Sequence, residues 1–186
     1  MDEGSYDENE IPENMKHWLQ FFQNEIRRLG NAEIVVTAND DSKEAIDPML
    51  TTRWDQIKPY NYQCHMGFIN DYALTVCAAT ALAQVMNYHK WPKTTSEEIP
   101  AYTVNYSGHG AKGWEAQPVY SFDWENMKDS YSGSEDAADA SVIAVSKLMR
   151  YCGQSLKMGY SNTSSSANSY LMTNALKKYF GYDNDL

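Results

Sequence analysis

The sequence has few basic residues and no long hydrophobic run. Fifteen Lys and Arg residues stand against 25 Asp and Glu residues, giving a formal net charge of −10. Surfaces that bind nucleic acid or anionic membrane need clustered positive charge, so neither partner is expected. No apolar run approaches the roughly 20 residues that cross a bilayer. The acidic opening Met1–Glu8 also lacks the basic start of a signal peptide.

Cysteine and histidine are scarce as well. The three cysteines are odd in number and lack the spacing of a disulfide scaffold, so at least one is expected to be a free thiol. A zinc site is the alternative use of these residues, built from the four donors Cys64, His65, Cys77 and His89. No close Cys-x-x-Cys or His-x-x-x-His pair supports it. We therefore expect no metal and no cofactor.

What is present is enough for one domain with an appendage. Of the 186 residues, 42% are hydrophobic, which is sufficient for a real core. After Pro12 and Glu13, apolar residues with helical spacing predict an amphipathic helix that Gly30 ends: Met15, Trp18, Leu19, Phe22, Ile26 and Leu29. Small and charged residues at 38–45 predict a solvated, protease-accessible linker, although an ordinary surface loop fits the same residues.

Cys77 stands at the start of a predicted helix. Thr75 is a polar cap for an alanine-rich run that extends to about His89 and breaks before Pro92. The residues expected on its buried face are Ala78, Ala81, Leu82, Val85 and Met86. A helix start favours thiolate over thiol, and the thiolate is the nucleophile. The alternative is a buried, inert cysteine that acts as a small hydrophobic residue.

The rest of the chain predicts two more helices and an irregular middle. Glycines, Pro118 and aromatics between Tyr102 and Phe122 indicate loops and short strands. One helix is expected between Asp136 and Cys152, with Ala140, Ile143, Leu148 and Met149 inward, and another between Ser166 and Phe180, ended by Gly181. A small-residue loop, Met158–Ser166, separates these two helices. Gln56 is either a structural hydrogen-bonding residue or an oxyanion donor, and its spacing alone does not decide.

Several segments together resemble the streptopain family of papain-like cysteine peptidases. They are Pro48–Gln56, Pro59–Asn61, Thr75–His89, Phe122–Trp124, Tyr131–Gly133, Lys147–Tyr160 and Ala175–Tyr182. The resemblance implies an α+β, papain-like fold and cysteine endopeptidase chemistry on protein or peptide substrates. It implies that Cys77 is the nucleophile, that the Cys77 backbone N–H and the Gln56 amide hold the oxyanion, and that Ser164, Ser165 and Ser166 flank the substrate.

The resemblance also implies a domain division and a localisation. Residues 1–45 correspond to the end of an inhibitory propeptide and its linker, so the propeptide helix is an expected partner of the catalytic domain. Residues 46–186 correspond to the mostly helical first part of that domain. Members of the family are secreted, periplasmic or on the cell surface, whereas this chain shows no signal peptide.

The chain departs from the family at two kinds of position. Val76 replaces the usual glycine before the nucleophile, and His65 replaces the proline that usually follows the earlier cysteine. A β-branched residue at position 76 would be strained if the backbone there needed a positive φ angle. None of the four histidines has the Gly-His-Ala context of the family's catalytic imidazole, which lies beyond position 186 in the family's order. We therefore expect a zymogen-like fragment with little or no proteolysis alone.

A non-catalytic function is the main alternative to a peptidase. In this hypothesis the helix around Trp18 and Phe22 docks on a complete peptidase and inhibits it, as a propeptide would. The absent histidine favours this alternative. The long peptidase-like stretch from Ile46 onward favours the truncated enzyme.

Overall fold

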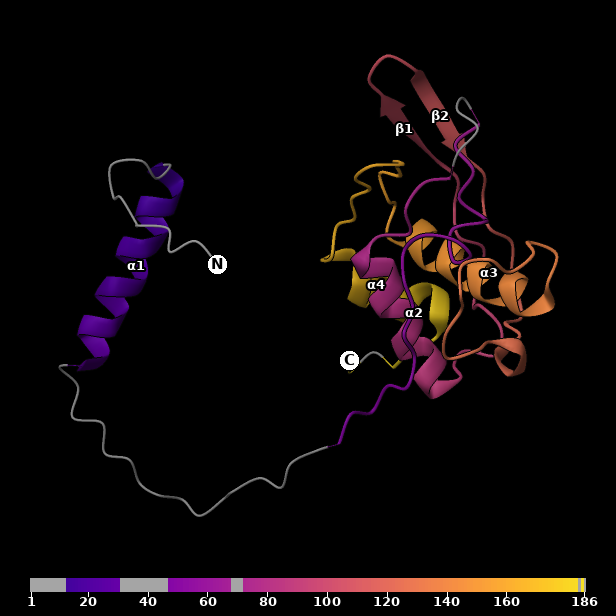
Figure 1. Ribbon diagram of the computed structural model, residues 1–186, viewed down its shortest axis with the longest axis horizontal. Helices are drawn as coiled ribbons and strands as arrows, with labels where there is room; N and C mark the ends of the chain where they lie inside the picture. The colour runs from indigo at the N-terminus through magenta and orange to yellow at the C-terminus, as the bar shows by residue number, and fades with distance from the viewer. Residues whose placement is uncertain (1–12, 31–46, 68–71, 184, 186) are drawn as a thin grey trace. The chain divides into compact units, whose positions relative to one another are not determined.

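The computed structural model describes residues 13–30, 47–67, 72–183 and 185, and divides the chain into two compact units, 1–45 and 46–186. The first unit contains helix α1, Glu13–Gly30, as its sequence period predicted (Figure 1). Phe21, Phe22 and Ile26 are exposed on this helix. The side chains of Met15, Trp18 and Leu29, and the predicted linker at 38–45, lie outside the described residues.

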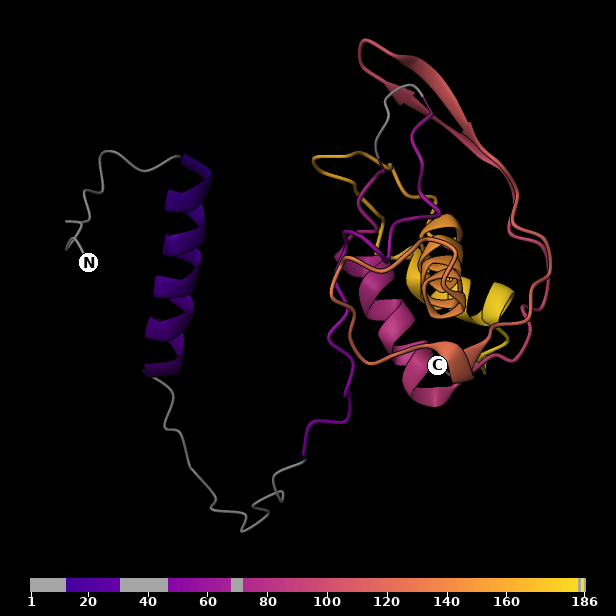
Figure 2. The same cartoon turned by 45° about the vertical axis from the view of Figure 1, so that its right-hand side comes forward.

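The second unit has a core of three helices with a small hairpin. Its helices are α2 (Cys77–His89), α3 (Ala140–Ser155) and α4 (Leu171–Phe180), with a short 3-10 helix at Trp124–Asn126. Helix α3 packs against both α2 and α4. Strands β1 (Tyr102–Tyr106) and β2 (Gly110–Trp114) pair antiparallel, with Tyr102 opposite Trp114. Figures 1 and 2 both show this hairpin projecting away from the helices.

The buried face of α2 is rotated from the one that the sequence predicted. Leu82 and Met86 are buried as expected, and the thiol of Cys152 in α3 lies 3.7 Å from the sulfur of Met86. Ala81 and Val85, however, are exposed, and Ala79 and Ala83 are buried in their place. The expectation was wrong because small apolar residues occur on nearly every side of this helix, so helical period alone does not select one face.

Helices α3 and α4 both begin later than the sequence predicted. Asp139 caps α3, because its side-chain oxygen accepts from the Ser141 N–H at 2.7 Å. Leu148 and Met149 are buried as expected, whereas Ala140 and Ile143 near the start are exposed. Helix α4 begins at Leu171 because the residues from Ser166 onward form one limb of a loop.

The end of α4 agrees with its prediction. Gly181 takes a left-handed conformation there, with φ of 62°, which an L side chain rarely adopts.

A buried guanidinium joins the hairpin to α3. Arg150 is 5% exposed and donates to the Tyr160 hydroxyl at 3.1 Å. Its guanidinium carbon lies 4.7 Å from the Trp114 ring centroid and 5.2 Å from that of Tyr160, so two aromatic faces stabilise the charge. Burial raises the pKa of the Tyr160 hydroxyl well above its ordinary value, which keeps it neutral. Tyr160, near the start of the small-residue loop, is thereby held in place.

None of the helices in the described part of the chain combines the length and apolar character that a membrane crossing requires. Within the same residues, no three His, Cys, Asp or Glu side chains come together as ligands for a metal ion.

Candidate active site

Cys77 is the first residue of α2, and its side chain is exposed. Cys64 and Cys152 are fully buried instead. Burial raises the pKa of the Cys64 thiol to about 11, and it raises the pKa of Cys152 as well, because an apolar interior disfavours the charged thiolate. The alternative of a buried Cys77 is therefore wrong, and Cys77 is the accessible thiol of the three.

Helix α2 begins without a side-chain cap. The predicted cap was Thr75, but the residue at the N-cap position is Val76, whose side chain makes no cap hydrogen bond. Thr75 is buried, and its hydroxyl lies 3.2 Å from that of Thr80. The first backbone N–H groups of a helix have no partner within the helix. The helix start at Cys77 therefore has N–H groups with no partner within the helix.

Val76 has the backbone conformation that the sequence analysis identified as costly. Its φ of 63° and ψ of 149° belong to a region that is essentially restricted to glycine. The side chain is nevertheless buried, with 7% exposed. Packing of the valine methyl groups thus opposes about 1–3 kcal/mol of backbone strain next to the candidate nucleophile.

We expect the free energy of unfolding to be higher for the Val76→Gly variant than for the Val76→Ala variant. Both variants lose the buried methyl groups, but only glycine also relieves the positive φ angle. The expected difference is about 1–2 kcal/mol in favour of glycine, although alanine is the more stabilising residue at ordinary backbone angles. Urea denaturation of both variants measures it, and an alanine variant equal to or more stable than the glycine variant would contradict the strain.

Gln56 is tied by its backbone to the segment that leads into Cys77. Its carbonyl accepts from the Thr75 N–H at 3.1 Å, and its own N–H donates to the Asp55 side chain at 2.6 Å. Its side chain is half-buried. The extended segment before it is anchored by Trp54, which is buried and donates to the Lys128 carbonyl at 2.8 Å. The structure therefore holds position 56 beside the residues just before the thiol.

The small-residue loop is tied to the same segment. The Leu74 N–H donates to the Ser161 carbonyl at 2.9 Å, three residues before Cys77. Inside the loop, the Ser165 hydroxyl donates to the Ser161 carbonyl and accepts from the Ser161 N–H, both at 2.7 Å. Ser165 is thus engaged within the loop, whereas Ser164 and Ser166 are exposed.

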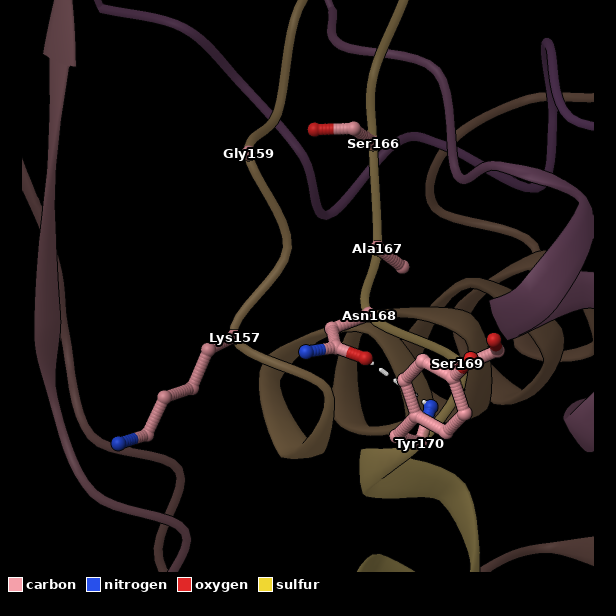
Figure 3. A pocket seen from close by; sticks show the side chains of 7 residues that line it. All are labelled: Lys157, Gly159, Ser166, Ala167, Asn168, Ser169 and Tyr170. Carbon is pink, nitrogen blue, oxygen red and sulfur yellow. Dashed lines mark hydrogen bonds between the residues drawn. The ribbon is translucent and has the colours of Figure 1, made fainter.

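The limbs of the loop form one antiparallel bridge, at Gly159 and Ser166. Each of these two residues donates its N–H to the carbonyl of the other, at 2.8 and 3.0 Å. An open cavity of about 530 Å³ lies beside the bridge (Figure 3).

The four histidines lie on separate elements. His89 ends α2, twelve residues after the thiol and so about 18 Å along the helix. His109 lies between the two strands of the hairpin. His65 is exposed and faces Tyr72, with ring centroids 5.4 Å apart. His17 belongs to α1 in the first unit.

Asn61 is a site-supporting residue that the sequence analysis did not single out. It is 4% exposed, and its side-chain nitrogen donates to the Ala73 carbonyl at 3.0 Å. This bond fixes the segment that continues through Leu74 to the thiol. The signal available in the sequence is an Asn in the turn-forming run Pro59–Asn61, because Asn side chains often hydrogen-bond backbone groups in turns.

Comparison with known proteins identifies the family to which this chain is similar. The profile of the Peptidase C10 family matches residues 54–186. Streptopain of Streptococcus pyogenes is 28% identical over 197 residues, covering 97% of this chain and 48% of streptopain. The Porphyromonas gingivalis thiol protease/hemagglutinin PrtT is 26% identical, over 98% of this chain and 22% of its own length. The chain thus spans about half of streptopain.

Two solved structures from Prevotella intermedia share the fold. Active wild-type interpain A, a cysteine protease, matches with a TM-score of 0.56 and 31% identity, over 75% of this chain and 61% of the protease chain. A prointerpain A fragment with one cysteine replaced by alanine matches with a TM-score of 0.61 and 32% identity, over 97% of this chain and 58% of that one. The α+β fold is accordingly papain-like, and the chain belongs to the Peptidase C10 family, the streptopain family of cysteine peptidases.

Proposed function

We propose that residues 46–186 carry the nucleophile of a streptopain-type cysteine endopeptidase, and that the nucleophile is Cys77. The observation that carries this proposal is the exposed thiol at the first residue of α2. The thiolate attacks a peptide carbonyl and forms a tetrahedral oxyanion. The C–N bond then breaks, the amine leaves with a proton, and water hydrolyses the thioester to release the acid and restore the thiol.

Two donors would stabilise the oxyanion in this chemistry. One is the backbone N–H of Cys77, which as the first helical N–H has no partner within the helix. The other is the side-chain amide of Gln56. The hydrogen bond between the Gln56 carbonyl and Thr75 supports this role, because it holds position 56 close in space to the helix start. The exposed Ser164 and Ser166 would contact the substrate beside them.

A peptide aldehyde tests the Gln56 role in the chain itself. The Cys77 thiol adds across the aldehyde carbonyl, its proton passes to the oxygen, and the resulting hemithioacetal oxygen occupies the oxyanion position. We expect Gln56→Ala to weaken the binding of a short acetylated peptide aldehyde by about 3- to 10-fold, the loss of one hydrogen bond. Alkylation of Cys77 by iodoacetamide is the control and stays unchanged. Equal aldehyde affinity in both proteins would contradict the assignment.

We also propose that catalysis needs an imidazole from outside these 186 residues. His89 lies about 18 Å from Cys77 along α2, His65 faces Tyr72, and His109 lies between the two strands of the hairpin. The 186-residue chain alone is then expected to hydrolyse casein no faster than its Cys77→Ala variant. Hydrolysis that disappears on Cys77→Ala would show that one of these histidines can serve.

We further propose that residues 1–45 are the end of a propeptide, so that the chain is zymogen-like. The two interpain A matches support this. The active form matches 75% of 186 residues, about 140, and the second unit contains the 141 residues from Ile46 to Leu186. The proform matches 97%, which extends the match into the first unit. The resemblance also implies secretion or a cell-surface location for the whole protein.

An inhibitory function is the second candidate, and the exposed apolar residues of α1 favour it. Phe21, Phe22 and Ile26 could cover a complementary surface on a complete peptidase. Adding excess chain to active interpain A and following substrate hydrolysis tests this idea. A Phe21→Ser, Ile26→Ser double variant is the matched control. Undiminished turnover at excess chain would remove the inhibitory function and leave the peptidase proposal untouched.

A further inference from the structure

The cavity beside the small-residue loop lies between residues of its two limbs. Lys157 and Gly159 line it from the limb that follows α3, and Ser166, Asn168, Ser169 and Tyr170 line it from the limb that leads into α4. Figure 3 shows the two limbs facing each other, with the Lys157 side chain extending away from the facing limb. At about 530 Å³ the space accommodates a side chain and adjoining backbone of a peptide.

One positive charge dominates the lining. Lys157 is the only Lys, Arg, Asp or Glu residue among the lining residues, and its amine has no ion pair or hydrogen bond within the described part of the chain. Lys157 also has a φ of 50°, a left-handed conformation that is uncommon for a non-glycine residue. The chain has a net charge of −10, so most of its surface repels an acidic ligand. An acidic ligand is therefore expected to bind near a local positive charge such as Lys157.

The other polar lining groups suit the same ligand. The side-chain nitrogen of Asn168 is a donor, while its oxygen already accepts from the Tyr170 N–H at 3.0 Å. Tyr170 is 92% exposed, so its ring can cover the apolar part of a ligand chain. A carboxylate on a short apolar stem therefore matches the lining better than a cation or a wholly apolar group.

The cavity lies on the far side of the Gly159–Ser166 bridge from the segment before Cys77. Ser161, which binds Leu74, lies within the loop beyond the bridge, whereas Lys157 and Asn168 lie on the opposite side of it. Lys157 is four positions before Ser161 in the chain and Asn168 is seven positions after it, so the bridge separates the cavity from the Leu74–Ser161 contact. A substrate residue in the cavity would then lie away from the scissile bond.

We infer that this cavity is a substrate subsite for an acidic side chain, Glu or Asp, remote from the scissile bond of an extended peptide. The inference rests on the proposed peptidase function and adds a sequence preference to it. Lys157 supplies the charge, Asn168 supplies a donor, and the Tyr170 ring covers the stem. An exposed ion pair contributes little binding energy. We therefore expect an acidic side chain to be preferred over a neutral one by about threefold, and this preference to decrease with added salt.

The test uses the 186-residue chain with Cys77→Ala, so that no covalent reaction contributes. The probes are three acetylated, amidated heptapeptides of Ala and Ser that carry Glu, Gln or Lys at the centre. Chemical shifts of the Ser166 and Ser169 backbone amides and of the Asn168 side-chain amide report binding. We expect the Glu peptide to bind about threefold more tightly than the Gln peptide, and the Lys peptide to bind least.

Matched lysine variants separate the subsite from general electrostatics. Lys157→Met abolishes the difference between the Glu and Gln peptides, whereas Lys93→Met, which removes an exposed lysine outside the cavity, preserves it. Sodium acetate and inorganic phosphate at the same concentrations as the peptide test for a simple anion site.

The outcomes are distinct from those of the proposed function. Equal binding of the Glu and Gln peptides, or persistence of their difference in Lys157→Met, overturns the subsite. Equal shifts with acetate or phosphate also overturn it. Each of these results leaves the assignment of Cys77 intact, because that assignment is measured by the reactivity of the thiol.

Discussion

Replacing Gly153 with alanine is expected to lower the free energy of unfolding of the second unit by about 2–3 kcal/mol. Gly153 is buried in α3, where an added Cβ would lie 2.8 Å from the Met158 sulfur and 3.1 Å from Cζ of Tyr160. Neither side chain has room to retreat, since both are fully buried. Tyr160 is held on its other sides by the Trp114 ring, at 4.3 Å between centroids, and by Arg150.

The clash would affect more than one contact. Moving Tyr160 disturbs the Arg150 hydrogen bond, and a buried guanidinium that loses a partner is costly. Tyr160 also precedes Ser161, whose carbonyl holds the Leu74 N–H. We therefore expect the alanine variant to loosen the small-residue loop as well as to lose stability.

Urea denaturation followed by tryptophan fluorescence measures this effect. Gly113→Ala in β2 is the matched control, because a Cβ there meets no atom within 4 Å and the glycine φ is not positive. The control is expected to change the unfolding free energy by less than about 0.5 kcal/mol. A Gly153→Ala variant as stable as the control would show that the packing around Tyr160 is not as tight as described.

Local chemistry allowed much of the fold to be predicted. The presence of helices α1 and α2, the break before Pro92 and the glycine stop at Gly181 all depend on neighbours in the sequence, and the structure contains each of them. The streptopain resemblance, which the family comparisons confirm, supplied the papain-like fold class.

Features that depend on distant residues were not predicted. The side of α2 that is buried depends on α3, which contacts it through pairs such as Met86 and Cys152. The late start of α4 results from the pairing of Ser166 with Gly159, a tertiary contact that overrides helix propensity. The sequence showed the risk at Val76, but only the backbone geometry shows that its φ is positive.

The candidate site likewise combines features that depend on neighbouring residues with features that depend on distant ones. The position of Cys77 at a helix start could be predicted, because a helix start is a local feature. The cavity beside the loop could not, since it exists only when Lys157 and Asn168 are brought onto facing limbs by the bridge. The role of Asn61 depends likewise on its bond to Ala73, twelve residues away.

Cys77 is expected to react with iodoacetamide at least about 100-fold faster than Cys64 or Cys152 in the folded chain. Its side chain is exposed, whereas the other two are fully buried. Only thiolate reacts, and with a pKa of about 11, roughly one Cys64 in 3,000 is a thiolate at about pH 7.5. Burial also raises the pKa of Cys152, and shielding from the reagent adds to the difference for both residues.

Peptide mass spectrometry of samples quenched over time measures the three rates. In concentrated urea the rates should converge to within about threefold, because an unfolded chain gives all three thiols ordinary pKa values and equal access. A Cys77→Ser variant should show no fast phase in the folded state. Rapid labelling of Cys64 or Cys152 in that variant would mean that the core around them opens readily.

Equal labelling of all three cysteines in the folded chain would contradict the peptidase proposal. It would mean that Cys64 and Cys152 are accessible to the reagent and that Cys77 is no more reactive than they are. Selective labelling without casein hydrolysis has a different meaning. It would show that the accessible thiol at the start of α2 is present, and it would agree with the proposal that the imidazole comes from outside these 186 residues.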